Sequence, residues 1–467
     1  MTATAAGTTR QVVAFCESMT CESLPAEIVH LAKRHILDSI AVMLGGIPNE
    51  ATQIVQRIMR KQGGHPEARV VGADWQGPVA SVAFANGVAG HVLDYDDTQL
   101  ATHRDAVYGL LTHPSVPCLA AALPFAEAAH SPGRDLICAF AVGTEVECRL
   151  ADASFPRHYY DGFHSSGTFG HFGAMVACAR LAGLNGDRLA AAMGLAAAQA
   201  AGLRENFGTM TKSFHVGKAA GNGVLATLLA EEGFTAAPDI LEAPRGFYNA
   251  AAGGFYPEKL APKLGRPWFF QDPGVSIKPH PSGSLTHPGM TLMLRLIKQH
   301  DIRPGQIVAI NVGTNKYMPN ALKHPRPTTE LEAKFSMQFC LAILALERKG
   351  GIAEFTDAAT QRPDVKAMIE KVNFYVHDEL EALGYDQMWT QLDIKLTDGR
   401  TVSGRTRVGR GHPEDPMSDE ELADKFRECA NNLLAPAQID RAIGIVFDLD
   451  RGGTIDDLMA AVTPSTK

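Results

Sequence analysis

The sequence predicts a mainly α-helical protein in which a large helical domain is formed by both chain ends and a smaller α+β lid domain is inserted between them. Three observations lead to this prediction. Alanine-rich helical stretches fill the first 265 or so residues, β-branched and aromatic segments begin near residue 268, and a helical pattern returns after Pro413. We therefore expect residues 1–267 and 411–467 to build the helical domain and residues 268–410 to build the lid.

The first strong helix signal lies near the N-terminus. Ser23 and Pro25 provide a start, the apolar run that follows has helical spacing, and Gly45-Gly46 provides a stop. Further alanine-rich stretches predict helices at 78–92, 115–130, 134–152, 166–182, 186–201 and 217–232. Several are apolar on almost every side, so we expect them inside a bundle, where their small side chains allow close helix approach.

The second part of the chain alternates between strands and helices. Segments 273–279, 306–313 and 371–377 have strand composition, and Asp398-Gly399 separates two alternating runs in the manner of a β-hairpin. Helices are predicted at 285–299 and 330–347, and again at 418–434 and 436–449. An α+β unit of about 140 residues has an ordinary domain size.

Composition narrows the functional classes. The 467 residues include 51 acidic and 43 basic side chains, a net charge of -8, which argues against a nucleic-acid-binding protein. No stretch has the length and hydropathy of a signal peptide or a transmembrane helix, so we expect no membrane association. The eight cysteines are scattered without a C-x-x-C pair, as expected for a reduced, cytoplasmic protein.

One group of polar residues follows a strongly apolar helix. His91 is followed by Asp94, Asp96 and Asp97, three carboxylates within four positions. They could be solvated acids of a loop, ligands of a divalent metal ion, or supports that orient a catalytic histidine or lysine. Sequence alone leaves the three interpretations open.

Two histidines stand just before predicted helix starts. His113 precedes Pro114-Ser115, and His164 opens the glycine-containing segment His-Ser-Ser-Gly-Thr-Phe-Gly-His. The positive end of a helix dipole favours the neutral imidazole and also favours anion binding. The pattern G-x-G-x-x-G is absent from this segment, so we expect no dinucleotide site there.

Lysines complete the set of candidate site residues. Lys212 lies near His215 and a glycine before an alanine-rich helix, where a buried lysine would need an anionic partner. Lys278 ends a predicted strand, and Tyr317 follows another. Histidines, lysines, a tyrosine and carboxylates are suited to removing a proton next to a carboxylate and to stabilising the resulting charge.

Taken together, these segments resemble the MmgE/PrpD family, which includes 2-methylcitrate dehydratases, cis-aconitate decarboxylases and iminodisuccinate epimerases. The resemblance covers nearly the whole chain and rests on HVLDYDDT, THPS, HSSGTFG, GTMTKSFHVGKAA, KPHPSGSLTHP and PTTELEAKFSMQF, which occur in the family's order. It implies a helical domain from both chain ends, an inserted α+β lid, a homodimer and no cofactor.

Residue by residue, the resemblance assigns catalytic roles to His113, His164, Lys212, Asp94 and Tyr317. It assigns substrate binding to Thr98 and Lys278, and we add His103. Two departures affect the substrate more than the fold. Gly283-Ser284 replaces a Cys-Arg pair of many members, and a longer 99–112 segment introduces His103 and Arg104.

We therefore expect a cofactor-independent lyase, foremost a dehydratase of a small hydroxy-polycarboxylate such as 2-methylcitrate. Decarboxylation or epimerisation of a related polycarboxylate would use the same groups, because all three reactions pass through a carbanion-like state. A metal-dependent hydrolase centred on His91, Asp94, Asp96 and Asp97 is the alternative from a different class. A catalytically inactive binding protein is a third, against which the intact set of His113, His164 and Lys212 argues.

Overall fold

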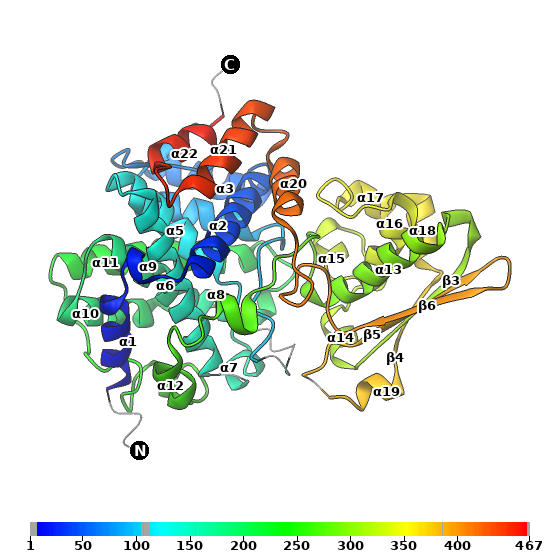
Figure 1. The fold of residues 1–467 in the computed structure, drawn as a ribbon, viewed down its shortest axis with the longest axis horizontal. Coiled ribbons are helices and arrows are strands. Elements are labelled where there is room, and N and C mark those ends of the chain that lie inside the picture. The colour runs from blue at the N-terminus through cyan, green and yellow to red at the C-terminus, as the bar shows by residue number, and fades with distance from the viewer. Residues whose placement is uncertain (1–6, 104–105, 107–111, 155, 385, 465–467) are drawn as a thin grey trace. The chain divides into compact units, whose positions relative to one another are not determined.

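The computed structural model describes residues 7–103, 106, 112–154, 156–384 and 386–464. The chain forms two compact units: residues 1–99, 110–275 and 418–467 make the first, and residues 100–109 and 276–417 make the second. The first unit is helical and the second combines a sheet with helices, so the predicted mainly α fold with both chain ends in one helical unit is confirmed (Figure 1).

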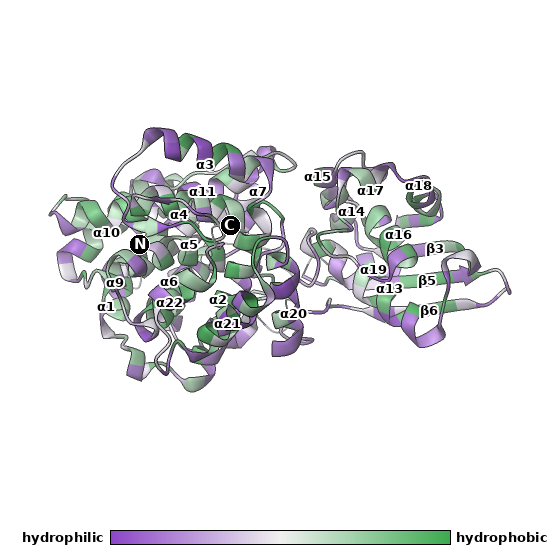
Figure 2. Cartoon of the chain, turned by 90° about the horizontal axis from the view of Figure 1, so that it is seen from above, coloured by the Kyte–Doolittle hydropathy of each residue, from purple (hydrophilic) through white to green (hydrophobic). Residues whose placement is uncertain are grey.

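The helical unit is built from long helices connected by short segments. They are α1 Thr8–Ser18, α2 Ala26–Gly46, α3 Glu50–Gln62, α4 Val79–His91, α5 Ser115–Ala128, α6 Gly133–Asp152, α9 Gly170–Leu181, α10 Gly186–Gln199 and α11 Thr211–Glu231, with the shorter α7 Arg157–Tyr160, α8 Ser165–Thr168 and α12 Phe247–Ala250. In α5 every residue except the last is buried. Figure 2 shows the contrast between such green inner helices and the purple-banded α3.

Two glycines allow the central helices α4 and α11 to meet. A Cβ atom at Gly87 would lie 2.8 Å from the Cα of Gly217, and one at Gly217 would lie 2.5 Å from a methyl carbon of Val88. Neither position therefore accepts a larger residue without a backbone shift. The close crossing confirms the expected role of small residues, and it brings the end of α4 near the start of α11.

The C-terminal helices pack on the N-terminal part of the same unit. Helices α20 Asp419–Ala430 and α21 Pro436–Asp448 contact α2, and α22 Ile455–Ala461 contacts α5 (Figure 1). Lys425 of α20 is buried, forms an ion pair of 2.5 Å with Asp38 and donates a hydrogen bond of 2.8 Å to the backbone oxygen of Tyr95. The chain end thus supports the turn that carries the three carboxylates.

The second unit contains a four-stranded sheet in the order β4-β3-β5-β6. Strand β3 Ile307–Thr314 pairs in parallel with β4 Val372–Val376 and antiparallel with β5 Thr390–Leu396, which forms the predicted hairpin with β6 Thr401–Thr406. Gly399 in the hairpin turn has φ 88°, a conformation that glycine adopts without strain. The helices are α13 His287–His300, α14 Tyr317–Ala321, α15 Glu330–Ala333, α16 Met337–Glu347, α17 Asp357–Gln361, α18 Pro363–Ile369 and α19 Asp378–Glu381.

Three sequence-based boundaries need correction. Segment 273–279 forms no strand: a short helical turn covers Phe270–Gly274, and prolines at 273 and 279 lack the N–H that a sheet ladder requires. The helix predicted at 330–347 is two helices, because Ser336 caps a new start. Helix α11 begins at Thr211, before the predicted 217.

No helix in the described part of the chain is long and apolar enough to cross a membrane. All eight cysteines are free; Cys21 is half-buried and the other seven are buried.

Candidate active site

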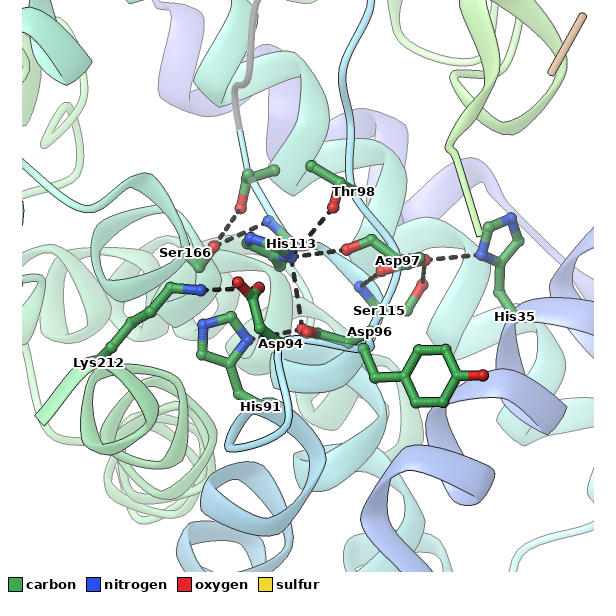
Figure 3. A network of polar contacts seen from close by, with 12 residues as sticks. His35, His91, Asp94, Asp96, Asp97, Thr98, His113, Ser115, Ser166 and Lys212 are labelled. Atoms are coloured by element: carbon green, nitrogen blue, oxygen red, sulfur yellow. Dashed lines mark hydrogen bonds and ion pairs between the residues drawn. The ribbon is translucent and has the colours of Figure 1, made fainter. Parts of the chain in front are cut away.

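The three carboxylates after α4 are buried, and each faces a different base. Asp94 forms an ion pair of 2.9 Å with Lys212 Nζ, and His91 Nδ1 lies 2.7 Å from a carboxylate oxygen of Asp96 (Figure 3). His35 Nδ1 lies 2.6 Å from Asp97. The interpretation of these residues as solvated loop acids is therefore wrong.

The backbone of this turn determines where the carboxylates point. Asp94 has φ 53°, in the left-handed region that aspartate tolerates better than most residues. Asp97 also accepts a hydrogen bond from the Ser115 hydroxyl at the start of α5. The turn is thus connected to α2 through His35, to α11 through Lys212 and to α5 through Ser115.

His113 lies over this turn with a defined orientation. Its Nδ1 donates to the backbone oxygen of Asp97 at 2.8 Å and lies 3.3 Å from the Thr98 hydroxyl and 3.6 Å from Asp96 (Figure 3). Its backbone N–H donates to the Ser166 hydroxyl at 2.8 Å. Because oxygen acceptors surround Nδ1, we assign the proton of the neutral ring to that atom, which makes Nε2 the atom for proton transfer.

His164 is placed next to three other histidines. Its ring centroid is 6.5 Å from that of His113 and 5.6 Å from that of His91, and its Nδ1 shares a 3.0 Å hydrogen bond with Nδ1 of His215. Burial lowers the pKa of His164 well below its usual value, and the neighbouring histidines and Lys212 lower it further. His164 is therefore a neutral ring at physiological pH.

Lys212 is buried where α11 begins. Besides Asp94, its ammonium lies 5.4 Å from the ring centroid of Phe207, which also contacts the ring of His164 edge-on. A carboxylate and an aromatic face both stabilise a cation in a protein interior. The structure thus brings together five residues predicted from sequence: Asp94, Thr98, His113, His164 and Lys212.

The other three predicted site residues belong to the second unit. Lys278 is buried and lines a small pocket of that unit together with Ser276, His287 and Arg410. Tyr317 begins α14 and lies beside Lys316. His103 is exposed and bridges to Ala106, whereas residues 104–105 and 107–111 lie outside the described residues. The roles of Lys278, Tyr317 and His103 stay predictions.

Three side chains of this cluster could serve as ligands of a metal ion. Among the described residues, ligand atoms of His91, Asp96 and His113 lie within 4.8 Å of one another. This set differs from the predicted metal centre, because Asp94 and Asp97 are bound to Lys212 and His35 instead. Three protein ligands would leave an open position of the kind that catalytic zinc uses.

Sequence reasoning missed several residues that support the site. His35 is the partner of Asp97, Ser166 orients the backbone of His113, and His215 is bonded to His164. Ser166 and His215 lie in the motifs that contain His164 and Lys212, so their nearness in sequence to those two residues was the available signal. For His35 the signal was weaker: it is one of a few polar residues in α2, a helix that is otherwise apolar over residues 32–44.

Comparison with protein-family models matches two stretches of the chain to two domains of one family. The model of the MmgE/PrpD N-terminal domain matches residues 10–259, and that of the MmgE/PrpD C-terminal domain matches residues 280–450. The chain belongs to the MmgE/PrpD family, as the sequence motifs predicted.

Its relatives include cis-aconitate decarboxylases. Cis-aconitate decarboxylase of Homo sapiens is 29% identical over 443 residues, covering 91% of this chain and 88% of the relative. The enzyme of Mus musculus is also 29% identical, with 91% and 86% covered, and that of Aspergillus terreus is 25% identical, with 97% and 95% covered. These relatives are lyases, so the prediction of a lyase is confirmed at the level of the family.

Proposed function

We propose that this protein is a lyase that decarboxylates a small polycarboxylate, with cis-aconitate as the substrate. The observation that carries the proposal is the buried cluster of His113, His164 and the Lys212–Asp94 pair. We choose cis-aconitate as the candidate substrate because the relatives that align with about nine-tenths of the chain are cis-aconitate decarboxylases.

The cluster supplies what such a reaction needs. Loss of carbon dioxide breaks a carbon–carbon bond and leaves the electron pair on a carbon next to a double bond, so an allylic anion forms and must be protonated. The ammonium of Lys212 can bind a substrate carboxylate and stabilise the developing negative charge. Asp94 keeps that ammonium in place at 2.9 Å.

We assign the proton donor to His113. When its ring is protonated, Nδ1–H stays bonded to the backbone oxygen of Asp97 and Nε2–H becomes the proton that is transferred. Asp96, 3.6 Å from Nδ1, would form an ion pair with that imidazolium. His164, with its lowered pKa, takes the role of a neutral ring that accepts a proton or a hydrogen bond.

Dehydration of 2-methylcitrate is the second candidate. Dehydration requires a base for the carbon-bound proton and an acid for the leaving hydroxyl, and two histidine rings with centroids 6.5 Å apart could divide these tasks. His164 would then act as the base and His113 as the acid.

The test is to incubate the purified protein with cis-aconitate, 2-methylcitrate and citrate and to follow carbon dioxide release and the products by NMR. Decarboxylation in D₂O should release carbon dioxide and place one deuterium on carbon in a five-carbon unsaturated diacid. Loss of water from 2-methylcitrate without carbon dioxide would favour the second candidate. Absence of turnover with all three acids would reject both.

A further inference from the structure

A second group of reactive side chains lines a surface pocket of the helical unit. The pocket has a volume of about 310 Å³ and lies where the segment before α2, the start of α6 and the end of α9 meet. Cys21, Cys138 and Arg180 are among its lining residues, one from each of these three segments. No residue of the candidate active site lines it.

The two cysteines of this pocket come from elements that pack together, because the turn Cys21–Ser23 contacts α6. Both line the same pocket, and the Cys21 thiol donates a hydrogen bond to the backbone oxygen of Arg134. Cys21 Sγ also lies 3.3 Å from a carboxylate oxygen of Asp135, which is one turn before Cys138 on the same face of α6. Neither cysteine is near the other in sequence, so the fold alone brings them together.

The surroundings make the two sulfurs chemically unequal. The neighbouring Cys21 thiol and the guanidinium of Arg180 lower the pKa of Cys138 from 9.0 to about 7, although its burial acts in the opposite direction. The neighbouring Cys138 sulfur, then burial and the Asp135 carboxylate, raise the pKa of Cys21. A thiolate beside a protonated thiol is the arrangement of an attacking cysteine and its resolving partner.

We propose that Cys21 and Cys138 form a redox-active pair that peroxide converts into an intramolecular disulfide. The Cys138 thiolate attacks one oxygen of hydrogen peroxide; an S–O bond forms, the O–O bond breaks, and the departing hydroxide takes a proton to become water. The Cys21 sulfur then attacks the Cys138 sulfenic acid; the S–S bond forms, the S–O bond breaks, and the second water leaves with the Cys21 proton. Two thiols lose two electrons, and one peroxide becomes two waters.

Cys16 provides an internal comparison. It also feels the charge of Arg180, but it is fully buried, does not line the pocket, and burial raises its pKa to about 12. The charge of Arg180 alone, without access from the pocket and without a partner thiol, should therefore leave Cys16 unreactive.

The test uses the full chain, purified under reducing conditions and treated with a small excess of hydrogen peroxide at pH 7. Peptide mapping without reduction should detect a Cys21–Cys138 crosslink, and thermal melting should shift upward by several degrees, because the bond closes a long loop of the unfolded chain. Without peroxide, iodoacetamide should alkylate Cys138 with a midpoint near pH 7, while Cys16 reacts only after denaturation.

Single variants separate the two roles. In Cys21→Ser, the sulfenic acid of Cys138 should persist and be trapped by dimedone. In Cys138→Ser, Cys21 should resist the same peroxide dose, and Cys16→Ser should form the crosslink as the parent chain does. The proposal is overturned if the folded parent chain yields no Cys21–Cys138 peptide under peroxide, or if Cys138 is alkylated no faster than Cys16.

Discussion

Replacing His113 or His164 tests whether the buried histidine cluster carries out the reaction. We choose His113→Gln and His164→Gln, because glutamine retains a polar amide of similar length but cannot transfer a proton near neutral pH. The matched control is His171→Gln. His171 lies in the same motif as His164, is buried in α9, and accepts a 3.0 Å hydrogen bond from the Asn222 amide, yet it lies outside the cluster.

The cluster variants should mainly lose turnover, whereas the control variant should mainly lose stability. Losing a general acid or base lowers a rate by about 100-fold to 10,000-fold, which corresponds to roughly 3–5 kcal/mol of activation free energy. A glutamine amide at position 113 can still donate to the Asp97 oxygen, so its effect on unfolding should stay below about 1.5 kcal/mol. His171→Gln removes the buried ring that accepts the hydrogen bond of the half-buried Asn222 amide, which we expect to cost about 1–3 kcal/mol of stability with turnover retained.

The assay measures kcat and the thermal melt on the same samples of all three variants. Both cluster variants should lose turnover with nearly unchanged melting, whereas the His171 variant should melt earlier with the kcat of the folded fraction intact. If His113→Gln or His164→Gln keeps full turnover, that histidine has no part in proton transfer, and the proposed mechanism fails for it.

Four further predictions follow from the same residues. Lys212→Met should abolish turnover and destabilise the protein by about 3–5 kcal/mol, because it removes the ammonium that pairs with the buried Asp94 carboxylate, and Asp94→Asn in the same chain should recover much of that stability in a double-mutant cycle. Activity should survive exhaustive chelation; stoichiometric zinc, manganese or iron whose removal stops turnover would contradict this. Lys278→Ala should impair turnover or substrate affinity without altering the helical unit, and near-wild-type kinetics for both Lys278→Ala and Tyr317→Phe would show that neither takes part. Burial lowers the pKa of His171 from 6.5 to about 4, so the unfolded chain binds a proton near pH 6.5 that the folded chain does not bind until about pH 4. The free energy of unfolding should therefore fall by up to about 3 kcal/mol for this group as pH drops from 6.5 towards 4, the melting temperature should fall with it, and His171→Gln should flatten this pH dependence.

Much of the fold could be predicted because its signals are local. Residues 134–152 read as a helix from their own spacing, and α6 occupies Gly133–Asp152. The dipeptide Asp398-Gly399 predicts a hairpin by its turn chemistry alone, and β5 and β6 flank it. The strand predicted at 273–279 was wrong. Its composition favours a strand, but its two prolines have no N–H group to donate to a neighbouring strand.

The site was predictable only in part, because its contacts are long-range. His113 and His164 were found through the helix starts that follow them, and α5 and α8 do begin there. The partner of Asp97 could not be found, since His35 is 62 positions away and carries no motif. Lys425 and Asp38 are further apart still, and their pairing depends on how the C-terminal helices return to α2.

The proposed active site contains three carboxylates, although its proposed substrate is a polyanion. Unpaired carboxylates that faced the substrate would repel it. Each is instead directed at a base from a different helix: Asp94 at Lys212 of α11, Asp96 at His91 of α4, and Asp97 at a histidine of α2. Neighbouring residues of one turn point in different directions, and the left-handed conformation of Asp94 separates them further. One turn therefore contacts three helices. Because each carboxylate is paired with a base, its charge no longer repels a polycarboxylate, and the same pairs hold Lys212 and His113 in the positions where we propose that the substrate binds.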